Sequence, residues 1–214
     1  MSLIYLIRHG QASFGAADYD HLSELGRVQC ELLGQDFARK GVNPDRVISG
    51  GLKRQQQSAL ACAPQADCER DERWNEFDFQ HLFACYQAEH NTDIEQHGDL
   101  KPLFFDMFMR WRLGEFDHQV PERFGAFRRR VLAALDELKE CEDKHIWVFT
   151  SGGPIACVIQ HLMGLSDNAM LELNWRLVNA GVTKLIVNKD GMHISSINEH
   201  AIFEGEQDSY LSYR

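Results

Sequence analysis

The chain has 214 residues, a formal net charge of −10 and an ordinary share of hydrophobic residues, so it can bury the core of one globular domain. The charge argues against nucleic acid as a partner, because proteins that bind it neutralise phosphates with a basic surface. A small phosphorylated ligand stays possible, since it needs only a local group of arginines. We therefore treat residues 1–214 as a single domain.

The cysteines show neither a CxxC pair nor the spacing of a zinc site, so we expect reduced thiols. They are Cys30, Cys62, Cys68, Cys85, Cys141 and Cys157. The first apolar run is too short for a signal peptide, and none has the length of a transmembrane helix. We expect a cytoplasmic protein without membrane contacts, and the sequence gives no indication of its oligomeric state.

The first half of the chain alternates between strand and helix patterns. Residues 3–7 are apolar and β-branched, which predicts a buried strand. The helical pattern that follows can be capped by Ser23 and ended by Gly41. Further along we expect a strand over 45–50, a helix over 51–63, and a strand or extended segment over 70–79.

The second half begins with residues 80–120, which are rich in Phe, Met, Trp and His and which we interpret as a mostly helical insertion serving as a lid. An amphipathic helix is expected to start at Pro121, because proline suits the first turn of a helix. The remaining predicted elements are a strand over 145–150, a helix over 153–164, and strands over 171–178, 182–188 and 192–198, with a turn at 189–191.

Strands that alternate with helices predict a three-layer α/β/α fold with a mainly parallel central sheet. Ligands on such sheets bind at the carboxyl ends of the strands. Polar, glycine-containing stretches follow three of the predicted strands: RHG at 8–10, SGG at 49–51 and TSGG at 150–153. We expect these stretches to meet in one pocket.

The first of these stretches suits phosphate chemistry. A neutral imidazole, here His9, can attack phosphorus if its other ring nitrogen is held as a donor. The neighbouring Arg8 can grip phosphate oxygens with two hydrogen bonds, and Gly10 allows a ligand to approach the backbone. The alternative is a histidine at a strand end beside a surface arginine.

Two further residues can complete such a site. Arg54 lies about one turn into a helix that starts at a strand end, where it can supply a second cation, although a solvated helix arginine is the alternative. Glu76 lies among Trp74, Phe77 and Phe79, and apolar surroundings raise the pKa of a carboxyl so that it can donate a proton. The alternative for Glu76 is an exposed carboxylate on a strand.

The third stretch has the pattern of a helix start. Ser151 is a good helix cap and Pro154 suits the first turn. Gly152 and Gly153 expose N–H groups at the positive end of the helix, where an anion can bind. A well-capped helix without a ligand has the same pattern, so function stays open at this point.

Together these motifs make the chain resemble the histidine phosphatase superfamily, the phosphoglycerate mutase-like fold, over nearly its whole length. The matching stretches are LIRHGQ, LSELGRVQ, SGGLKRQQQSA and WNEFDF. The resemblance implies that His9 is the phosphorylated nucleophile, that Arg8 and Arg54 hold the phosphoryl group, and that Glu76 is the proton donor. It implies a phosphomonoester hydrolase for a small phosphorylated substrate or inorganic phosphate, without metal or cofactor, because arginines supply the charge.

The chain also departs from the family pattern. The family carries S-H-G-G where this chain has Thr150 to Gly153, so Ser151 stands in place of a second histidine. Gln55 replaces the alanine of the pattern S-x-L-x-R-A-x-Q-T, and Gly15 stands where many members carry an asparagine. Serine offers one neutral hydrogen bond, and losing a charge-assisted contact costs about 1.5–3 kcal/mol. We expect Ser151 and Gly152 to bind phosphate in its place.

Three alternatives remain at the level of sequence. The first is a phosphate-binding member of the family with weak or no turnover, which the serine motivates. The second is a serine hydrolase built on Ser151 with Asp190 and His193 or His200, although Phe149 replaces the first glycine of G-x-S-x-G. The third is a mutase, which we disfavour because the arginines at 128–130 read as the solvated face of a helix.

Overall fold

The computed structural model describes residues 1–13, 20–90 and 100–213. The strands are β1 (Ser2–Arg8), β2 (Arg46–Ser49), β3 (Cys68–Arg70), β4 (His145–Thr150), β5 (Val182–Asn188) and β6 (Gly191–Glu199). The α-helices are α1 (Glu24–Arg39), α2 (Lys53–Cys62), α3 (Phe79–His90), α4 (Lys101–Leu113), α5 (Phe124–Lys139), α6 (Gly152–Met163) and α7 (Asp167–Arg176), and the 3₁₀ helices are η1 (Glu72–Trp74), η3 (Ala201–Phe203) and η4 (Gly205–Tyr210).

The six strands form one sheet in the order β3-β2-β4-β1-β5-β6. The strands from β3 to β1 are parallel, β5 runs antiparallel to β1, and β6 runs antiparallel to β5. Arg8 pairs with Thr150, and Ser49 pairs with Phe149, so β1, β2 and β4 end at the same edge. The predicted mainly parallel sheet and the meeting of three strand ends are confirmed.

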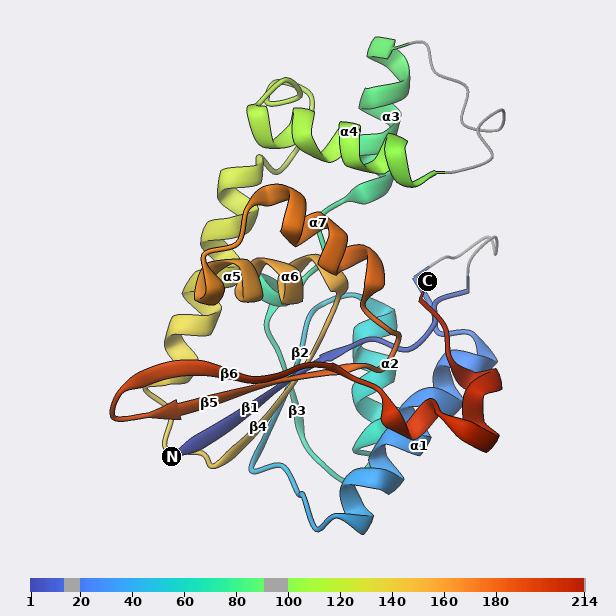
Figure 1. Cartoon of the computed structure of the whole chain (residues 1–214), viewed down its shortest axis with the longest axis vertical. Helices are drawn as coiled ribbons and strands as arrows, with labels where there is room; N and C mark the ends of the chain where they lie inside the picture. The colour runs from blue at the N-terminus through green and yellow to red at the C-terminus, as the bar shows by residue number, and fades with distance from the viewer. Residues whose placement is uncertain (14–19, 91–99, 214) are drawn as a thin grey trace.

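Side chains alternate between the two faces of the sheet and build two cores. Ile4 and Leu6 of β1 point to one core, which α5, α6 and α7 cover, while Tyr5 and Ile7 point to the other, which α1 and α2 cover. Figure 1 shows these helices on opposite sides of the sheet. The three-layer α/β/α arrangement predicted from the sequence is therefore confirmed.

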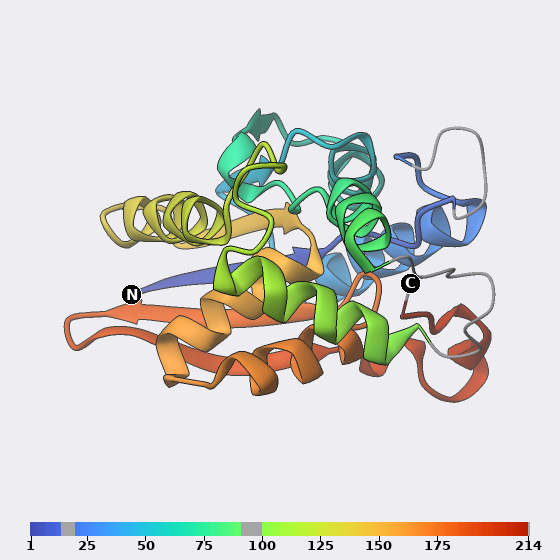
Figure 2. The ribbon, with the colours of Figure 1, turned by 90° about the horizontal axis from the view of Figure 1, so that it is seen from above.

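Helices α3 and α4 extend beyond the layers, above α6 and α7 (Figures 1 and 2). Their aromatic side chains join the core: Phe77 packs 5.0 Å from Trp111 between ring centroids, and Phe104 packs 5.5 Å from Trp175 of α7. The helical character predicted for residues 80–120 is confirmed for α3 and α4, and part of the segment, 91–99, lies outside the described residues. Its role as a lid stays a prediction.

One predicted strand was wrong, and the segment predicted as a strand or extended is only partly so. Residues 171–178 alternate apolar and polar side chains, but most of them belong to α7, because Ser166 caps this helix by accepting a hydrogen bond from Ala169 N at 3.2 Å. Of residues 70–79, only Arg70 lies in a strand. There Asp71 accepts a hydrogen bond from Arg73 N at 2.9 Å and starts the 3₁₀ turn η1 instead.

Helix boundaries follow the predicted signals in most places. Ser23 caps α1 by accepting a hydrogen bond from Gly26 N at 3.0 Å, and Gly41 and Gly164 follow α1 and α6 with positive φ angles. Helix α5 starts at Phe124, three residues after Pro121, which is a correction to the expected start. Within the described residues, no helix has the length and apolar character that crossing a membrane requires.

Candidate active site

His9 follows β1 directly and is buried, with 6% of its surface exposed. Its Nδ1 lies 2.7 Å from the carbonyl oxygen of Gly10, which only accepts, so Nδ1 carries the ring proton. Nε2 is then the nitrogen with the lone pair, and the Nε–H of Arg54 donates to it at 3.2 Å. Burial, together with the charges of Arg54 and Arg8, lowers the pKa of His9 well below 6.5. The ring is a neutral imidazole with a defined nucleophilic nitrogen.

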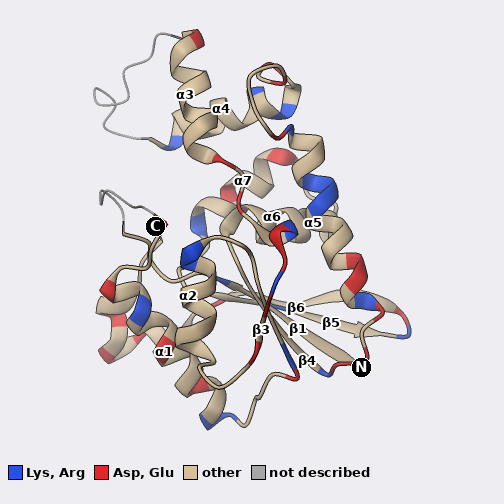
Figure 3. Ribbon diagram, turned by 180° about the vertical axis from the view of Figure 1, so that it is seen from behind, with Lys and Arg blue, Asp and Glu red and all other residues tan. Residues whose placement is uncertain are grey.

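Arg54 lies in the first turn of α2 with 8% of its surface exposed, which contradicts the solvated alternative. Besides its bond to His9, its Nη1 donates to Asp20 Oδ1 at 2.7 Å, and the other oxygen of Asp20 accepts from Lys53 N at 2.9 Å. The guanidinium is therefore fixed from two sides. Figure 3 shows the basic start of α2, to which Arg54 belongs.

Arg8 is the last residue of β1, and its guanidinium contacts segments near the C-terminus of the chain. Its Nη1 donates to the carbonyl oxygens of Leu177 and Tyr213, the latter at 2.8 Å. A Cβ on Gly152 would lie 3.8 Å from its Nε, so the guanidinium is beside the start of α6. The charges of Arg8 and Arg54 both lower the pKa of His9 and oppose the raised pKa of Glu76. Both cations therefore act on the same two groups.

Glu76 lies in the loop between η1 and α3 and is half-buried. Its Oε2 accepts from Gly153 N at 3.0 Å, and its Oε1 accepts from Phe77 N at 3.1 Å. Burial raises the pKa of Glu76 above 4.5, and the N–H of Gly153 and the charge of Arg54 limit this rise. The carboxyl is thus anchored to the start of α6 and keeps its proton to a higher pH than an exposed glutamate.

Arg130 holds the loop that presents Glu76. Its Nη1 donates to the carbonyl oxygens of Arg73 and Asn75, at 2.8 and 2.7 Å, and its Nε pairs with Glu122 at 2.6 Å. The expectation that the arginines at 128–130 form a solvated face was therefore wrong for Arg130, although the other two are exposed. The loop carbonyls leave this guanidinium no role as a second phosphate site.

Ser151 follows β4, and its side chain is fully buried. It does not cap α6 through its side chain, which corrects the expected role. Instead its Oγ accepts from the side-chain amide of Gln55 at 2.9 Å. A Cβ on Gly152 would overlap with Asn174 Oδ1, and one on Gly153 would overlap with Glu76 Oε1, so both glycines allow a close approach to the helix start.

Three further residues were missed as contributors to the site. In the sequence, Gln55 stands out only as a departure from the family pattern. Asn179 donates from Nδ2 to the carbonyl oxygen of His9 at 3.2 Å, and Asn174 packs against Gly152. Neither asparagine belongs to a recognisable motif, and Asn174 lies in the segment wrongly predicted as a strand, so no sequence signal pointed to them.

The serine hydrolase alternative fails on geometry. Asp190 and His193 lie near the turn of the β5–β6 hairpin, at the edge where β1 begins, whereas Ser151 follows β4 at the opposite edge (Figure 1). Nδ1 of His200 lies 2.5 Å from the carbonyl oxygen of Asn198. The structure therefore does not assemble the required triad from these residues.

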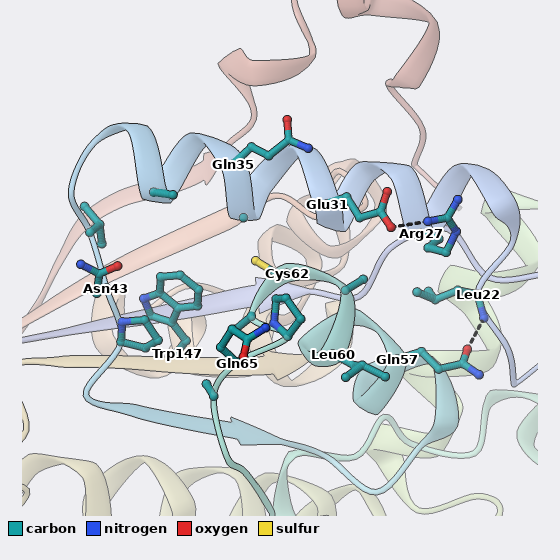
Figure 4. A pocket seen from close by; sticks show the side chains of 18 of the residues that line it. Leu22, Arg27, Glu31, Gln35, Asn43, Gln57, Leu60, Cys62, Gln65 and Trp147 are labelled. Atoms are coloured by element: carbon teal, nitrogen blue, oxygen red, sulfur yellow. Dashed lines mark hydrogen bonds and ion pairs between the residues drawn. The ribbon is translucent and has the colours of Figure 1, made fainter.

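A large hollow of about 1100 Å³ lies elsewhere, between α1 and the segment from α2 to β3 (Figure 4). Leu22, Leu60, Gln65 and Trp147 are among the residues that line it, and the Arg27–Glu31 ion pair crosses its rim. None of the six predicted site residues lines this hollow. Its chemistry is mostly apolar, so it is separate from the polar strand-end site.

The comparison with protein families decides the assignment. The model of the histidine phosphatase superfamily (branch 1) matches residues 4–200. The chain belongs to this superfamily. The resemblance seen in the sequence is confirmed, while Gly15, one of the departures from the family pattern, lies outside the described residues.

Solved structures of the family share the fold. A phosphoserine phosphatase mutant from Entamoeba histolytica, in complex with phosphoserine, matches with a TM-score of 0.66 and 22% identity, covering 93% of this chain and 98% of its own. A putative α-ribazole-5′-phosphate phosphatase from Escherichia coli matches at 0.69 and 21%, with coverage of 93% and 98%. A mycobacterial glucosyl-3-phosphoglycerate phosphatase with inorganic phosphate matches at 0.67 and 21%, with coverage of 94% and 99%. No curated protein matches the chain.

Proposed function

We propose that the protein is a phosphomonoester hydrolase that works through a phosphohistidine on His9 and acts on a small phosphorylated substrate. The observation that carries this proposal is the state of His9: Nδ1–H donates to Gly10 O, and Nε2 presents a lone pair beside the buried Arg54. Membership of the histidine phosphatase superfamily supports it. So do the neighbours solved with phosphoserine and with inorganic phosphate.

The reaction has two steps. In the first, the phosphoryl group displaces the Nε–H of Arg54 from His9 Nε2. The freed lone pair forms a bond to phosphorus, the bond from phosphorus to the ester oxygen breaks, and Glu76 gives its proton to that oxygen. In the second, water attacks phosphorus, Glu76 takes a proton from it, and the N–P bond breaks to release phosphate. Arg8 and Arg54 neutralise the phosphoryl oxygens, which is the main requirement of phosphoryl transfer.

Glu76 can act in both steps because its carboxyl is hydrogen-bonded to the start of α6, which we propose faces the phosphoryl group. Its bond to Gly153 N fixes the carboxyl next to Ser151 and Gly152, which we propose as further phosphate contacts. The N–H groups at the start of α6 add a positive partial charge. Helices α3 and α4 are proposed as the lid that selects the substrate, and we place the protein in the cytoplasm.

The test is to trap the intermediate. Wild-type protein mixed with an aryl phosphate and quenched in base should carry one phosphate that is stable to base and labile to acid. His9→Ala should carry none and should lose turnover. Turnover by His9→Ala at the wild-type rate would overturn the mechanism. If the wild-type protein binds phosphate without turning over any of a broad panel of phosphomonoesters, the non-catalytic alternative holds instead.

A further inference from the structure

Two of the residues that depart from the family pattern contact each other. Gln55 comes from the first turn of α2 and Ser151 from the end of β4, 96 residues apart, and both are completely buried. Nε2 of Gln55 lies 2.9 Å from Ser151 Oγ. The replacements read separately in the sequence therefore form one unit in the structure, next to the residues that hold His9.

The direction of this hydrogen bond is fixed by the other contacts of the Gln55 amide. Leu52 N donates to its Oε1 at 3.2 Å, and its Nε2 donates to the carbonyl oxygen of Trp74, also at 3.2 Å. A backbone N–H can only donate and a carbonyl can only accept, so the amide cannot be flipped. Gln55 is therefore the donor, and Ser151 Oγ is the acceptor.

The hydroxyl proton of Ser151 remains available. Its oxygen already accepts from Gln55, and within the described part of the chain no hydrogen bond uses this hydroxyl as a donor. A buried hydroxyl proton without an acceptor costs free energy, so a site that keeps one needs a ligand to satisfy it. Ser151 lies between Thr150, whose carbonyl accepts from His9 N at 2.8 Å, and Gly152, which adjoins Arg8. The backbone of Ser151 therefore lies between a residue that holds His9 and a residue beside Arg8, where we expect an anion to bind.

Gly50 makes room for this arrangement. A Cβ at this position would overlap with Oε1 of Gln55, and in the family pattern S-x-L-x-R-A-x-Q-T the position of Gly50 carries serine. Gly50, Gln55 and Ser151 thus depart from the pattern together. Glycine in place of serine at position 50 leaves space for the glutamine that replaces alanine at position 55. This glutamine in turn binds the serine that replaces histidine at position 151.

We propose that Gln55 is a positioning residue that turns the hydroxyl of Ser151 into a hydrogen-bond donor for a phosphoryl oxygen, with Gly50 providing the space. This rests on the proposed function and adds to it the device that takes the place of the second family histidine. Gln55 does not touch the phosphoryl group, and it acts only by occupying the acceptor side of Ser151 Oγ.

The test is a double-mutant cycle with Gln55→Met and Ser151→Ala, read as kcat/KM for an aryl phosphate and as the inhibition constant of vanadate. Each single variant should lose about tenfold in both quantities, because one hydrogen bond to a charged oxygen disappears. The double variant should lose about tenfold as well, because the second change removes nothing further. Gln56→Met, an exposed neighbour on the same helix, should match the wild type.

Gly50→Ala gives a second route to the same state without touching either partner. The new Cβ should displace the Gln55 amide and also the side chain of Asn75, whose Oδ1 would lie 2.9 Å away. It should lower both quantities at least as much as Gln55→Met, and the part of the loss that acts through Gln55 should disappear when Gln55 is already methionine. Gly51→Ala is the matched control, because its Cβ would meet only the side chains of Arg70 and Glu72, which are exposed and can move.

The possible results distinguish a failure of the proposed Gln55–Ser151 pairing from a failure of the proposed function. Losses that multiply to about 100-fold in the double variant would overturn the pairing, as would a Gln55→Met variant that melts at a lower temperature but keeps wild-type kcat/KM and vanadate inhibition. Wild-type protein that hydrolyses no phosphate ester and binds no vanadate would overturn the proposed function itself, and the pairing with it.

Discussion

We expect the two sides of the candidate site to bind a phosphoryl group with different chemistry. On the side of β1 and α2, a buried guanidinium bonds directly to the imidazole, as Arg54 does to His9. Where α2 meets the end of β4, a neutral pair, Gln55 and Ser151, lies where the family pattern places an alanine and a histidine. Under the proposed function, one side holds the oxyanion by fixed charge, while the other relies on a hydroxyl and on backbone N–H groups.

The difference also predicts how substitutions on each side affect activity. Arg54 is held by Asp20 as well as by His9, so its charge is balanced before any ligand binds. The pair of Gln55 and Ser151 carries no charge and is packed against Gly50 without room to spare. We expect changes on the first side to remove catalysis and changes on the second side to tune it.

The largest effect that tests this division is expected at Glu76, whose carboxyl is hydrogen-bonded to the start of α6. Glu76→Gln should slow alkyl phosphates by about a thousandfold, because their leaving oxygen needs a proton. The same variant should slow nitrophenyl phosphate only a few fold, since nitrophenolate leaves without help. Steady-state kinetics with both substrates check this, and equal losses would assign Glu76 a structural role.

A second test removes the charge on the first side. Arg54→Ala should lower kcat/KM about 100-fold or more, because it removes a cation that we propose to bind the phosphoryl group and breaks the ion pair with Asp20. Arg54→Lys should recover only part of the loss, since a lysine cannot bond to His9 and Asp20 with the same fork geometry. The division would fail if Arg54→Ala cost less than Ser151→Ala in the same assay.

A third test tries to convert the neutral side into the family pattern. The family pattern has histidine at this position, but in this chain the contact with Gln55 predicts that Ser151→His lowers activity. The imidazole has to occupy space that the Gln55 amide fills, and both positions are fully buried. Ser151→His should therefore lose activity about tenfold, and the double change with Gln55→Ala should recover it. A gain of activity by Ser151→His alone would show that the pair is not a packing unit.

The smallest effect concerns pH. The pKa of His9 is lowered from 6.5, so its neutral form persists into more acidic solution, and the pKa of Glu76 is raised from 4.5, so its protonated form persists into more alkaline solution. Both shifts favour the pair of states that the first step needs. The acid limb of the rate profile should lie below pH 6.5, and Glu76→Gln should remove the alkaline limb for an alkyl phosphate. An unchanged profile in Glu76→Gln would contradict this.

The sequence predicted those parts of the molecule that depend on local patterns. The runs at 3–7 and 145–150 are mostly apolar, and they form the central strands β1 and β4. The ends of β4 are as expected, and β1 is one residue longer at each end. Because parallel strands end at one edge, His9 and Ser151 were placed in the same region without any structural information. The position of Arg54 near the start of a helix at that edge left a solvated arginine as the alternative, and the family resemblance pointed to the phosphate-binding role.

The rest depended on contacts between distant segments. The alternation at 171–178 matched a strand as well as a helix, and only the Ser166 cap decided for α7. Arg130 read as a surface residue because the loop carbonyls that it binds lie 55 and 57 residues away. The contact between Gln55 and Ser151 was invisible for the same reason: each residue looked like an isolated departure, and Gln55 had no assigned partner.

The most direct measurement is a crystal structure of the protein soaked with vanadate, because it shows in one experiment whether both sides meet at one oxyanion. The account predicts vanadium bonded to His9 Nε2, with vanadate oxygens contacted by the guanidinium groups of Arg8 and Arg54 and by Ser151 Oγ, while Gln55 still donates to that Oγ. Vanadate bound away from His9, or bound there with Ser151 Oγ turned from it, would contradict the account.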